Sequence, residues 1–380
     1  MIVGVPREIK DEEYRVAVTP IGVREFLRAG HSVIVECGAG VGSGFEDVAY
    51  SDAGARLAMV DEVFAQAEMI VKVKEPLPVE LPRFRHDQIL YTFLHLGAAY
   101  ARELTEALLA IGIRGLAYET VALANGAHPL LFPMSEVAGR LAIQAGATHL
   151  QKNHGGRGVL LGGVTGVPPV KVVIIGGGTV GINAAKMAEG MRARTIVLDT
   201  QAERLAYIDD IFGGRIETVL SNESAIEEEI AEADLVVGAV LLPGGAQAPR
   251  LVSRAMLKNM RPGSVLVDVA IDQGGCFETS RPTTHTDPTY VVDGVIHYCV
   301  SNMPGAVART STIALTGATL PYGVAIATKG FDQAVKDDPA LALGVNVYRG
   351  LLTIPSVAAA HGLAYTPLAQ ALGSTAAPGV

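Results

Sequence analysis

Residues 171–181 read Lys-Val-Val-Ile-Ile-Gly-Gly-Gly-Thr-Val-Gly. The apolar run 172–175 is typical of a buried parallel strand. It leads into the spacing Gly176-x-Gly178-x-x-Gly181 and then into residues 182–191, which have the composition of a helix. Glycine suits such a turn because a side chain would keep the backbone away from a pyrophosphate, and a helix start offers unpaired N–H groups to the phosphates. The stretch therefore predicts the phosphate-binding turn of a dinucleotide site.

The residues after this turn strengthen the prediction. A second apolar run, 195–198, ends in Asp199, which is about where a carboxylate that binds a ribose belongs. Thr200 and Glu203 have the spacing of a capping box, so we expect a helix to start there and Asp199 to lie at the strand tip. The alternative is a glycine-rich turn in an ordinary α/β domain, but the order strand, turn, helix, strand, acid favours a Rossmann domain.

The composition limits the class of protein. A chain of 380 residues favours two domains, and a net charge of −9 without a basic stripe argues against nucleic acid as a partner. Cys37, Cys276 and Cys299 have no zinc or CxxC spacing, so we expect no metal site and a reducing, cytoplasmic location. The first residues do not resemble a signal peptide, and no apolar run approaches the roughly 20 residues of a membrane span.

The first part of the chain alternates between expected strands and helices. This pattern implies a parallel sheet, in which ligands bind beyond the carboxyl ends of the strands. The expected strands are 2–6, 32–36, 69–73, 89–94 and 115–118, and the expected helices are 21–28, 47–53, 61–67 and 101–111. A long helix from 133 to about 152 leads into the nucleotide domain, whose further strands are expected at 216–220, 234–241, 264–271 and 295–300.

The tail of the chain is expected to be helical from about Arg309, with Pro321 as a kink and no strand after residue 300. Such a tail cannot form a domain alone, so we expect it to pack on the first domain. The predicted fold is therefore α/β, with two Rossmann-like, doubly wound parallel-sheet domains that flank a cleft and are linked by long helices. The first would comprise residues 1–132 and 308–380 and bind a substrate, and the second, 133–307, would bind the dinucleotide.

Candidate residues for chemistry lie in expected loops or at strand tips. A dinucleotide site suggests hydride transfer, which requires a substrate anchor and a group that moves protons. Arg15 and Lys74 are candidates to hold a carboxylate, and His95 and Asp272 are candidates for proton transfer. Each also has a structural interpretation: a charge in a solvated loop, an exposed strand end, a satisfied histidine or a capping carboxylate. Asp268, inside an apolar run, would be buried against a donor.

At these residues the chain resembles alanine dehydrogenase over nearly its whole length. The matching segments are 4–10 with 15–20, Lys74-Glu-Pro76, Leu94-His-Leu96, 133–140, the glycine turn, 238–241, 270–275, 280–284 and Asn302-Met-Pro304. The amino-terminal half of proton-translocating transhydrogenase shares the architecture, but Lys74, His95 and Ile271-Asp-Gln273 look like the dehydrogenase.

The resemblance implies reversible NAD-dependent oxidative deamination of L-alanine to pyruvate and ammonia in a homo-hexamer. It implies that Arg15 and Lys74 bind the substrate and that His95 and Asp272 handle protons. The positions implied for NAD, together with the glycine turn, are Ser135, Gly176, Gly178, Thr179, Val180, Gly181, Asp199, Arg204, Ser221, Val240, Leu241, Val269, Ala270, Ile271, Asp272, Arg281, Val300, Ser301, Asn302 and Met303.

Two departures from the family pattern stand out. Phe93 occupies a position where tyrosine is expected before the Leu-His pair, so any role of a hydroxyl is lost there. The loop 242–249 has one additional residue, and Gln247 stands where lysine is common. Two other functions stay open at this point: a transhydrogenase-like subunit that needs a membrane partner, and an NAD-binding regulatory protein without turnover.

Overall fold

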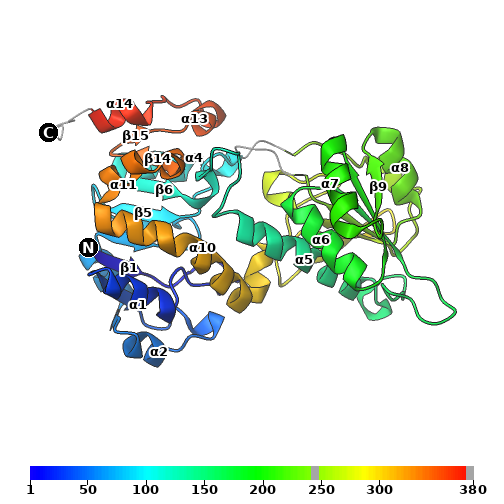
Figure 1. Ribbon diagram of the computed structural model, residues 1–380, viewed down its shortest axis with the longest axis horizontal. Coiled ribbons are helices and arrows are strands. Elements are labelled where there is room, and N and C mark those ends of the chain that lie inside the picture. The colour runs from blue at the N-terminus through cyan, green and yellow to red at the C-terminus, as the bar shows by residue number, and fades with distance from the viewer. Residues whose placement is uncertain (241–247, 374–380) are drawn as a thin grey trace. The chain divides into compact units, whose positions relative to one another are not determined.

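The computed structural model describes residues 1–240 and 248–373 of a chain that divides into two compact units (Figure 1). Unit 1 combines Met1–Met134 with the segment that starts at Gly305, and unit 2 is Ser135–Pro304. Each unit is a sheet covered by helices, so the predicted α/β class with two doubly wound sheets is confirmed.

Unit 1 contains an eight-stranded sheet in the order β15-β14-β6-β5-β4-β1-β2-β3. Strands β1 to β6 are parallel to one another. Strand β14 is antiparallel to β6, and β15 is antiparallel to β14. The strands are β1 Ile2–Val5, β2 Ser32–Glu36, β3 Arg56–Ala58, β4 Met69–Val71, β5 Ile89–Thr92, β6 Arg114–Ala117, β14 Val345–Tyr348 and β15 Leu351–Leu352. The helices are α1 Pro20–Arg28, α2 Asp47–Asp52, α3 Val60–Gln66, α4 Arg102–Ile111, α10 Ala308–Lys329, α11 Phe331–Asp337, α12 Pro339–Gly344, α13 Pro355–His361 and α14 Leu368–Gly373.

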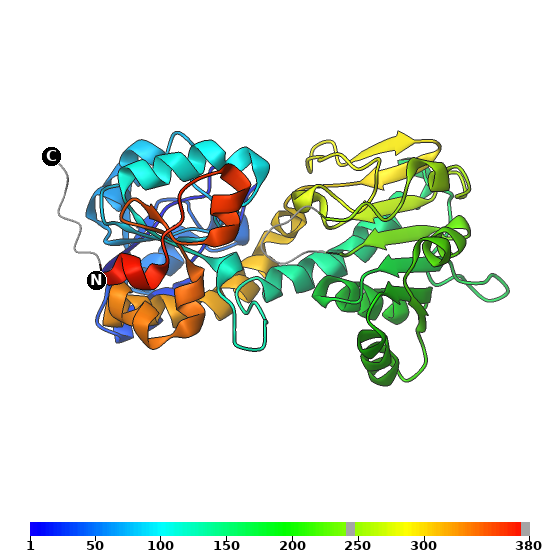
Figure 2. The same ribbon diagram turned by 90° about the horizontal axis from the view of Figure 1, so that it is seen from above.

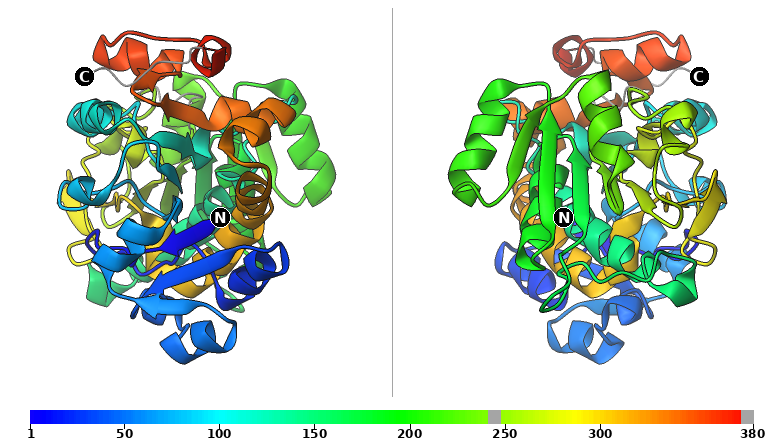
Figure 3. Two further views of the ribbon diagram at one scale, coloured as in Figure 1. Left: turned by 90° about the vertical axis from the view of Figure 1, so that its left-hand side faces the viewer. Right: turned by 90° about the vertical axis from the view of Figure 1, so that its right-hand side faces the viewer.

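The tail of the chain contains strands, so the expectation of no strand after residue 300 is wrong. Strand β14 pairs with β6 and extends the sheet of unit 1, as the left view of Figure 3 shows. Its sequence, Val-Asn-Val-Tyr, is short and includes the polar Asn346. That asparagine is buried and donates to Thr120 Oγ1 at 2.7 Å, so its fit to the sheet depends on a residue more than 200 positions away.

Helices cover both faces of the unit 1 sheet. Helices α3, α4 and α13 supply one apolar layer. On the other face α1 and α10 lie side by side, and the Tyr91 hydroxyl on β5 donates to the carbonyl of Thr319 on α10 (Figure 1). Helix α1 begins as expected, with Pro20 at its first position and Thr19 Oγ1 accepting from the N–H of Gly22.

Unit 2 contains a seven-stranded sheet in the order β12-β13-β11-β10-β7-β8-β9 (Figure 2). Only the edge strand β12, which was not expected, is antiparallel to its neighbour. The strands are β7 Lys171–Ile175, β8 Arg194–Asp199, β9 Glu217–Leu220, β10 Leu235–Gly238, β11 Val265–Asp268, β12 Thr289–Val292 and β13 Val295–Tyr298. The helices are α5 Phe132–His149, which begins in unit 1, α6 Thr179–Gly190, α7 Ala202–Phe212, α8 Glu223–Ala231 and α9 Arg254–Leu257.

The central strand β7 is apolar from Val172 to Ile175 because both its faces are buried there. Val172 and Ile174 pack in the layer that includes α5, α6 and α7, whereas Val173 and Ile175 pack in the layer that includes α8 and α9. Successive side chains of a strand point to opposite faces, so a strand between two helical layers needs an unbroken apolar run.

The expected capping box before α7 is absent. The helix begins at Ala202 with Gln201 as its N-cap, and no side chain caps it. Instead, Oδ1 of Asp199 accepts from the N–H of Gln201 at 2.9 Å. The carboxylate at the end of β8 thus replaces Thr200 as the acceptor nearest to the helix start.

Candidate functional site

Both sheets reverse their strand order once near the middle, and the candidate residues emerge there. In unit 1, β1 and β4 are neighbours, with β2 beyond β1 and β5 beyond β4. Arg15 lies in the loop after β1, Lys74 follows β4 and His95 follows β5. These are carboxyl ends of parallel strands, where ligands of open α/β sheets bind. The structure therefore places the three predicted residues of unit 1 at one edge of one sheet.

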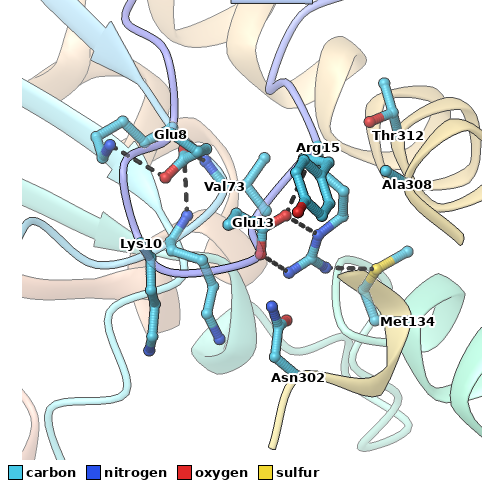
Figure 4. Close-up of polar contacts among 12 residues, drawn as sticks. Glu8, Lys10, Glu13, Arg15, Val73, Met134, Asn302, Ala308 and Thr312 are labelled. Carbon is cyan, nitrogen blue, oxygen red and sulfur yellow. Dashed lines mark hydrogen bonds and ion pairs between the residues drawn. The ribbon is translucent and has the colours of Figure 1, made fainter. Parts of the chain in front are cut away.

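Arg15 is a buried residue with a buried partner. Its Nε and Nη2 donate to the two carboxylate oxygens of Glu13 at 2.7 and 2.5 Å, and its Nη1 donates to Sδ of Met134 at 3.2 Å (Figure 4). The side chains of Arg15 and Glu13 are only 3% and 0% exposed. The interpretation of Arg15 as a solvated loop charge is therefore wrong, and its guanidinium is fixed by a two-point ion pair.

A second buried ion cluster lies beneath Lys74. Lys72 Nζ lies 3.1 Å from Glu8 Oε2 and 2.8 Å from Glu80 Oε1, and its side chain is fully buried. The Glu8 carboxylate also accepts from the N–H of Val73 at 2.6 Å and from that of Lys74 at 3.4 Å (Figure 4). Burial raises the pKa of Glu8, although the charge of Lys72 opposes the rise. Glu8 thus joins the loop after β1 to the end of β4.

The charges of Lys74, Lys10 and His95 act on the carboxylate of Glu75. Burial alone would raise the pKa of Glu75, but the charges of Lys74, Lys10 and His95 outweigh it, and the pKa is lowered. Glu75 Oε1 accepts from Lys10 Nζ at 2.5 Å, and its buried Oε2 has no hydrogen-bond partner among the described residues. The backbone of Lys74 is tied to β5, because its carbonyl accepts from Thr92 Oγ1 at 3.0 Å.

In unit 2 the glycine turn has the shape that the sequence predicts. Gly176 has φ 104°, a value open mainly to glycine, and a Cβ on Gly181 would lie 1.8 Å from the carbonyl oxygen of Gly176. A Cβ on Gly178, the N-cap of α6, would meet nothing within 4 Å. Thr179 and Val180 form the first turn of α6. The backbone N–H groups at this helix start lie beside the open space at Gly178, an arrangement that suits a pyrophosphate.

Asp199 is held against this turn. Its Oδ2 accepts from the N–H of Gly177 at 2.7 Å, and its carbonyl accepts from the N–H of Ser221, which follows β9, at 2.8 Å. Arg204 Nε donates to the carbonyl of Gly177, and its guanidinium lies 5.4 Å from the ring centre of Tyr207. The structure therefore brings together three of the predicted cofactor residues, Asp199, Arg204 and Ser221, around the glycine turn.

The loop after β11 is built around Asp268. This fully buried carboxylate accepts from the N–H groups of Ala270 and Cys276 at 3.1 and 2.9 Å, and from Ser280 Oγ at 2.5 Å. Burial raises its pKa, and these hydrogen bonds oppose the rise. Asp268, not Asp272, is thus the structural carboxylate, and it ends the strand instead of lying inside it. Asp272 is exposed in a 3₁₀ turn, Ile271–Gln273.

The other predicted cofactor residues follow the carboxyl ends of neighbouring strands, with three exceptions. Val240 follows β10, Val269 follows β11, and Val300, Ser301, Asn302 and Met303 follow β13. Arg281 lies apart, with its guanidinium 4.0 Å from the ring centre of Tyr290 on the edge strand β12. Ser135 lies in α5, and Leu241 lies outside the described residues.

Several residues of the site were missed from sequence: Glu8, Glu13, Lys72, Glu75, Glu119 and Met134. One feature of the sequence could have indicated the two buried acids Glu8 and Glu13: residues 7–15 carry seven charged side chains in nine positions. Such a run is typical of a solvated loop, whereas Glu8 and Glu13 are buried in it. A run of mixed acids and bases beside a strand tip is thus compatible with internal ion pairs.

Two kinds of feature are absent from the described residues. No described helix is long and apolar enough to cross a membrane. Within 1–240 and 248–373, no group of three or more His, Cys, Asp or Glu side chains is arranged to hold a metal ion.

Comparison with known proteins identifies relatives over the full chain. Residues 4–138 match the family described as "Alanine dehydrogenase/PNT, N-terminal domain", and residues 142–355 match "Alanine dehydrogenase/PNT, C-terminal domain". The alanine dehydrogenase of Methanococcus maripaludis is 58% identical over 374 residues, which is 98% of this chain and 100% of that protein.

Solved structures agree with this assignment. An L-alanine dehydrogenase superposes with a TM-score of 0.91 at 52% identity and covers 95% of this chain and 99% of its own. A transhydrogenase from Sinorhizobium meliloti superposes with a TM-score of 0.80 at 25% identity, covering 94% and 100%. With both family domains matched and relatives above 50% identity along its length, the chain belongs to the alanine dehydrogenase/PNT family.

Proposed function

We propose that the protein is an NAD-dependent L-alanine dehydrogenase, which interconverts L-alanine and pyruvate with release or uptake of ammonia. The observation that carries the proposal is the set of Arg15, Lys74 and His95 at the carboxyl edge of the unit 1 sheet. A protein that only bound a dinucleotide would have no use for two cations at that edge, each with an acidic neighbour. The name of the relatives, alanine dehydrogenase, supports this reaction.

The residues of unit 2 fit a dinucleotide. Gly178 leaves open space at the start of α6, which suits a pyrophosphate, and Asp199 stands at the end of β8, where it suits the ribose hydroxyls. Bound NAD supplies a nicotinamide that accepts and returns hydride. We assign unit 1 to the amino acid and unit 2 to NAD.

The chain's own residues perform the remaining tasks. Arg15 and Lys74 bind the carboxylate and the oxygen of the substrate. Glu13 holds Nε and Nη2 of Arg15 and thereby orients the guanidinium that we assign to the substrate. His95 and Asp272 exchange protons with the substrate nitrogen and with the water that adds to the iminium carbon.

The proposal extends to a cytoplasmic homo-hexamer, as the family resemblance implies. The three cysteines are free thiols, and two of them, Cys276 and Cys299, are buried, which fits a reducing compartment.

The first experiment is an initial-rate assay of NADH formation with L-alanine and NAD. D-alanine, glycine, L-serine and L-glutamate are assayed in parallel, with NADP as the second cofactor. We expect turnover with L-alanine to exceed turnover with the other amino acids. Tight NAD binding without turnover of any amino acid would refute the proposal and favour the transhydrogenase-like or regulatory function.

The proton-transfer assignment is tested by His95→Ala and Asp272→Ala. Each variant should lose about 100- to 10,000-fold in kcat, the usual contribution of a positioned proton-transfer group. His86→Ala and Asp210→Ala, which change exposed residues of the same types, are the matched controls and should keep normal rates. Near-normal kcat in both His95→Ala and Asp272→Ala would contradict the assignment.

A further inference from the structure

His95 has a backbone conformation that is uncommon for a residue other than glycine. Its φ is 50°, in the left-handed region, and it lies directly after β5 in the segment Phe93-Leu94-His95. Residues with a Cβ adopt this region at an energetic cost, so it persists only where the surroundings enforce it. Groups around His95 must therefore hold it in this conformation.

The carboxylate of Glu119 binds the backbone N–H groups of His95 and of the residue before it. Glu119 Oε1 accepts from the N–H of His95 at 2.6 Å and from that of Leu94 at 3.2 Å, and Oε2 lies 3.3 Å from the same Leu94 nitrogen. Two consecutive N–H groups that converge on one anion form an anion-binding nest, and hydrogen bonds to an ionised acceptor are stronger than neutral ones. Glu119 is thus a direct restraint on the turn that carries the imidazole.

The position of Glu119 is itself set by the sheet. It lies in the 3₁₀ turn Tyr118–Thr120 directly after β6, and β6 is the neighbour of β5 in register Thr92↔Ala117. The carboxylate therefore comes from one strand tip and restrains the adjacent tip. Exposed carboxylates on helices, such as Glu103 on α4, have no comparable contact among the described residues.

A second group fixes the ring of His95 and not its backbone. The imidazole stacks on the phenyl ring of Phe93, with centroids 5.5 Å apart and planes at 3°. Phe93 is buried and packs edge-on against Tyr118, whose hydroxyl donates to the carbonyl of Lys72 at 3.0 Å. The ring thus rests on a buried aromatic pair that is hydrogen-bonded to the end of β4, close to Lys74.

We propose that Glu119 is a positioning residue for the dehydrogenase reaction: it holds the Leu94–His95 backbone in its left-handed turn so that the imidazole lies flat on Phe93. The inference rests on the proposed proton-transfer role of His95 and adds a residue that does not touch substrate. Glu119 acts through His95, because its contacts are to backbone N–H groups of that turn.

The test combines turnover with the chemical reactivity of His95 itself. In Glu119→Ala we expect kcat for L-alanine to fall about 10- to 100-fold, the scale of an ångström-sized misplacement of a catalytic group. We expect the KM for NAD to stay within about two-fold, since the glycine turn lies in unit 2, and the pH profile of kcat to shift. Glu119→Gln keeps one acceptor oxygen, so its kcat should lie between that of Glu119→Ala and that of the unmodified protein.

The second readout is the rate of carbethoxylation of His95 by diethyl pyrocarbonate, followed by peptide mass spectrometry without substrate or NAD. Release of the ring from Phe93 should change this rate at least about three-fold in Glu119→Ala, while the rate at the exposed His86 stays constant. Glu103→Ala is the matched control for both readouts and should match the unmodified protein.

The outcomes separate this inference from the proposed function. Loss of turnover in His95→Ala, with neither turnover nor His95 reactivity changed in Glu119→Ala, would overturn the positioning role alone. If His95→Ala has normal turnover but Glu119→Ala changes the reactivity of His95, the catalytic role of His95 would be overturned. The restraint of its backbone by Glu119 would then still stand. If Glu119→Ala does not fold, Glu119→Gln takes its place in both measurements. A Glu119→Gln protein identical to the unmodified protein in turnover and in His95 reactivity would overturn the inference.

Discussion

Replacing Lys72 by methionine tests whether the buried ion cluster of unit 1 stabilises the fold. Lys72 Nζ lies 3.1 Å from Glu8 and 2.8 Å from Glu80, and all three side chains are nearly inaccessible to solvent. Methionine fills most of the same volume but leaves two buried carboxylates without their cation. Removing one partner of a buried ion pair costs about 3–5 kcal/mol. For a unit of this size, with about 2–4 °C per kcal/mol, the melting temperature should fall by roughly 6–20 °C.

The loss of stability in Lys72→Met should depend on pH, and the pKa of Glu8 determines in which direction. Burial, only partly offset by Lys72, raises the pKa of Glu8 above its ordinary value of 4.5 in the folded protein. A carboxyl with a raised folded pKa contributes stability that is complete below the unfolded pKa and is lost as pH rises through the folded pKa. Deleting Lys72 raises the folded pKa of Glu8 further, so the loss extends to higher pH. The difference in melting temperature between the two proteins should therefore shrink as pH falls from about 8 to about 5.

Calorimetry or circular dichroism is the suitable measurement, because the chain has no tryptophan to report unfolding by fluorescence. The control is Lys336→Met, which changes an exposed lysine of α11 in the same unit. Its free energy of unfolding should stay within about 0.5 kcal/mol of that of the unmodified protein. The triple variant Glu8→Gln, Lys72→Met, Glu80→Gln should recover part of the loss, since no buried charge is left unpaired. A Lys72→Met protein that melts within about 2 °C of the unmodified one at pH 8, or a difference that does not vary with pH, would refute the argument.

Two further predictions concern the ligands. Asp199→Asn should reduce the preference for NAD over NADP by about 100-fold or more, because unit charges about 4 Å apart repel by about 4 kcal/mol at an effective dielectric constant of 20. Initial rates with both cofactors measure this, and an unchanged preference would refute the role of Asp199. Glu13→Gln should raise the KM for L-alanine at least about 10-fold with little change in the KM for NAD, because the orientation of Arg15 relies on both oxygens of Glu13. Equal KM values for L-alanine in the two proteins would show that Arg15 does not need this partner.

The nucleotide-binding unit was predictable because its signals are local. Gly176, Gly178, Gly181 and Asp199 lie within one strand–helix–strand segment, so their spacing alone fixes which residues can meet. The same is true of Thr19 and Pro20 at the start of α1. For these two segments the spacing in the sequence determines the geometry, and the prediction and the structure agree.

The acidic partners of the substrate residues were not predictable from spacing. Whether Glu8 is solvated or buried depends on Lys72 and Val73, which follow β4. The restraint on His95 comes from Glu119, which follows β6. The expected capping box is absent as well: Asp199 accepts from the N–H of Gln201, and Gln201 instead of Thr200 is the N-cap of α7. Competition between acceptors is decided by the folded geometry, which the order of residues does not specify.

The pairing of β14 with β6 has a consequence for how the polypeptide is made. Ribosomes extend chains at about 5–20 residues per second, so β14 follows β6 out of the ribosome after an interval on the order of 10–50 s. All strands of unit 2 are synthesised within that interval, while β6 presents unpaired backbone groups along one edge. The nascent chain thus carries an open sheet edge for most of its synthesis, the kind of surface on which aggregation begins and which chaperones cover.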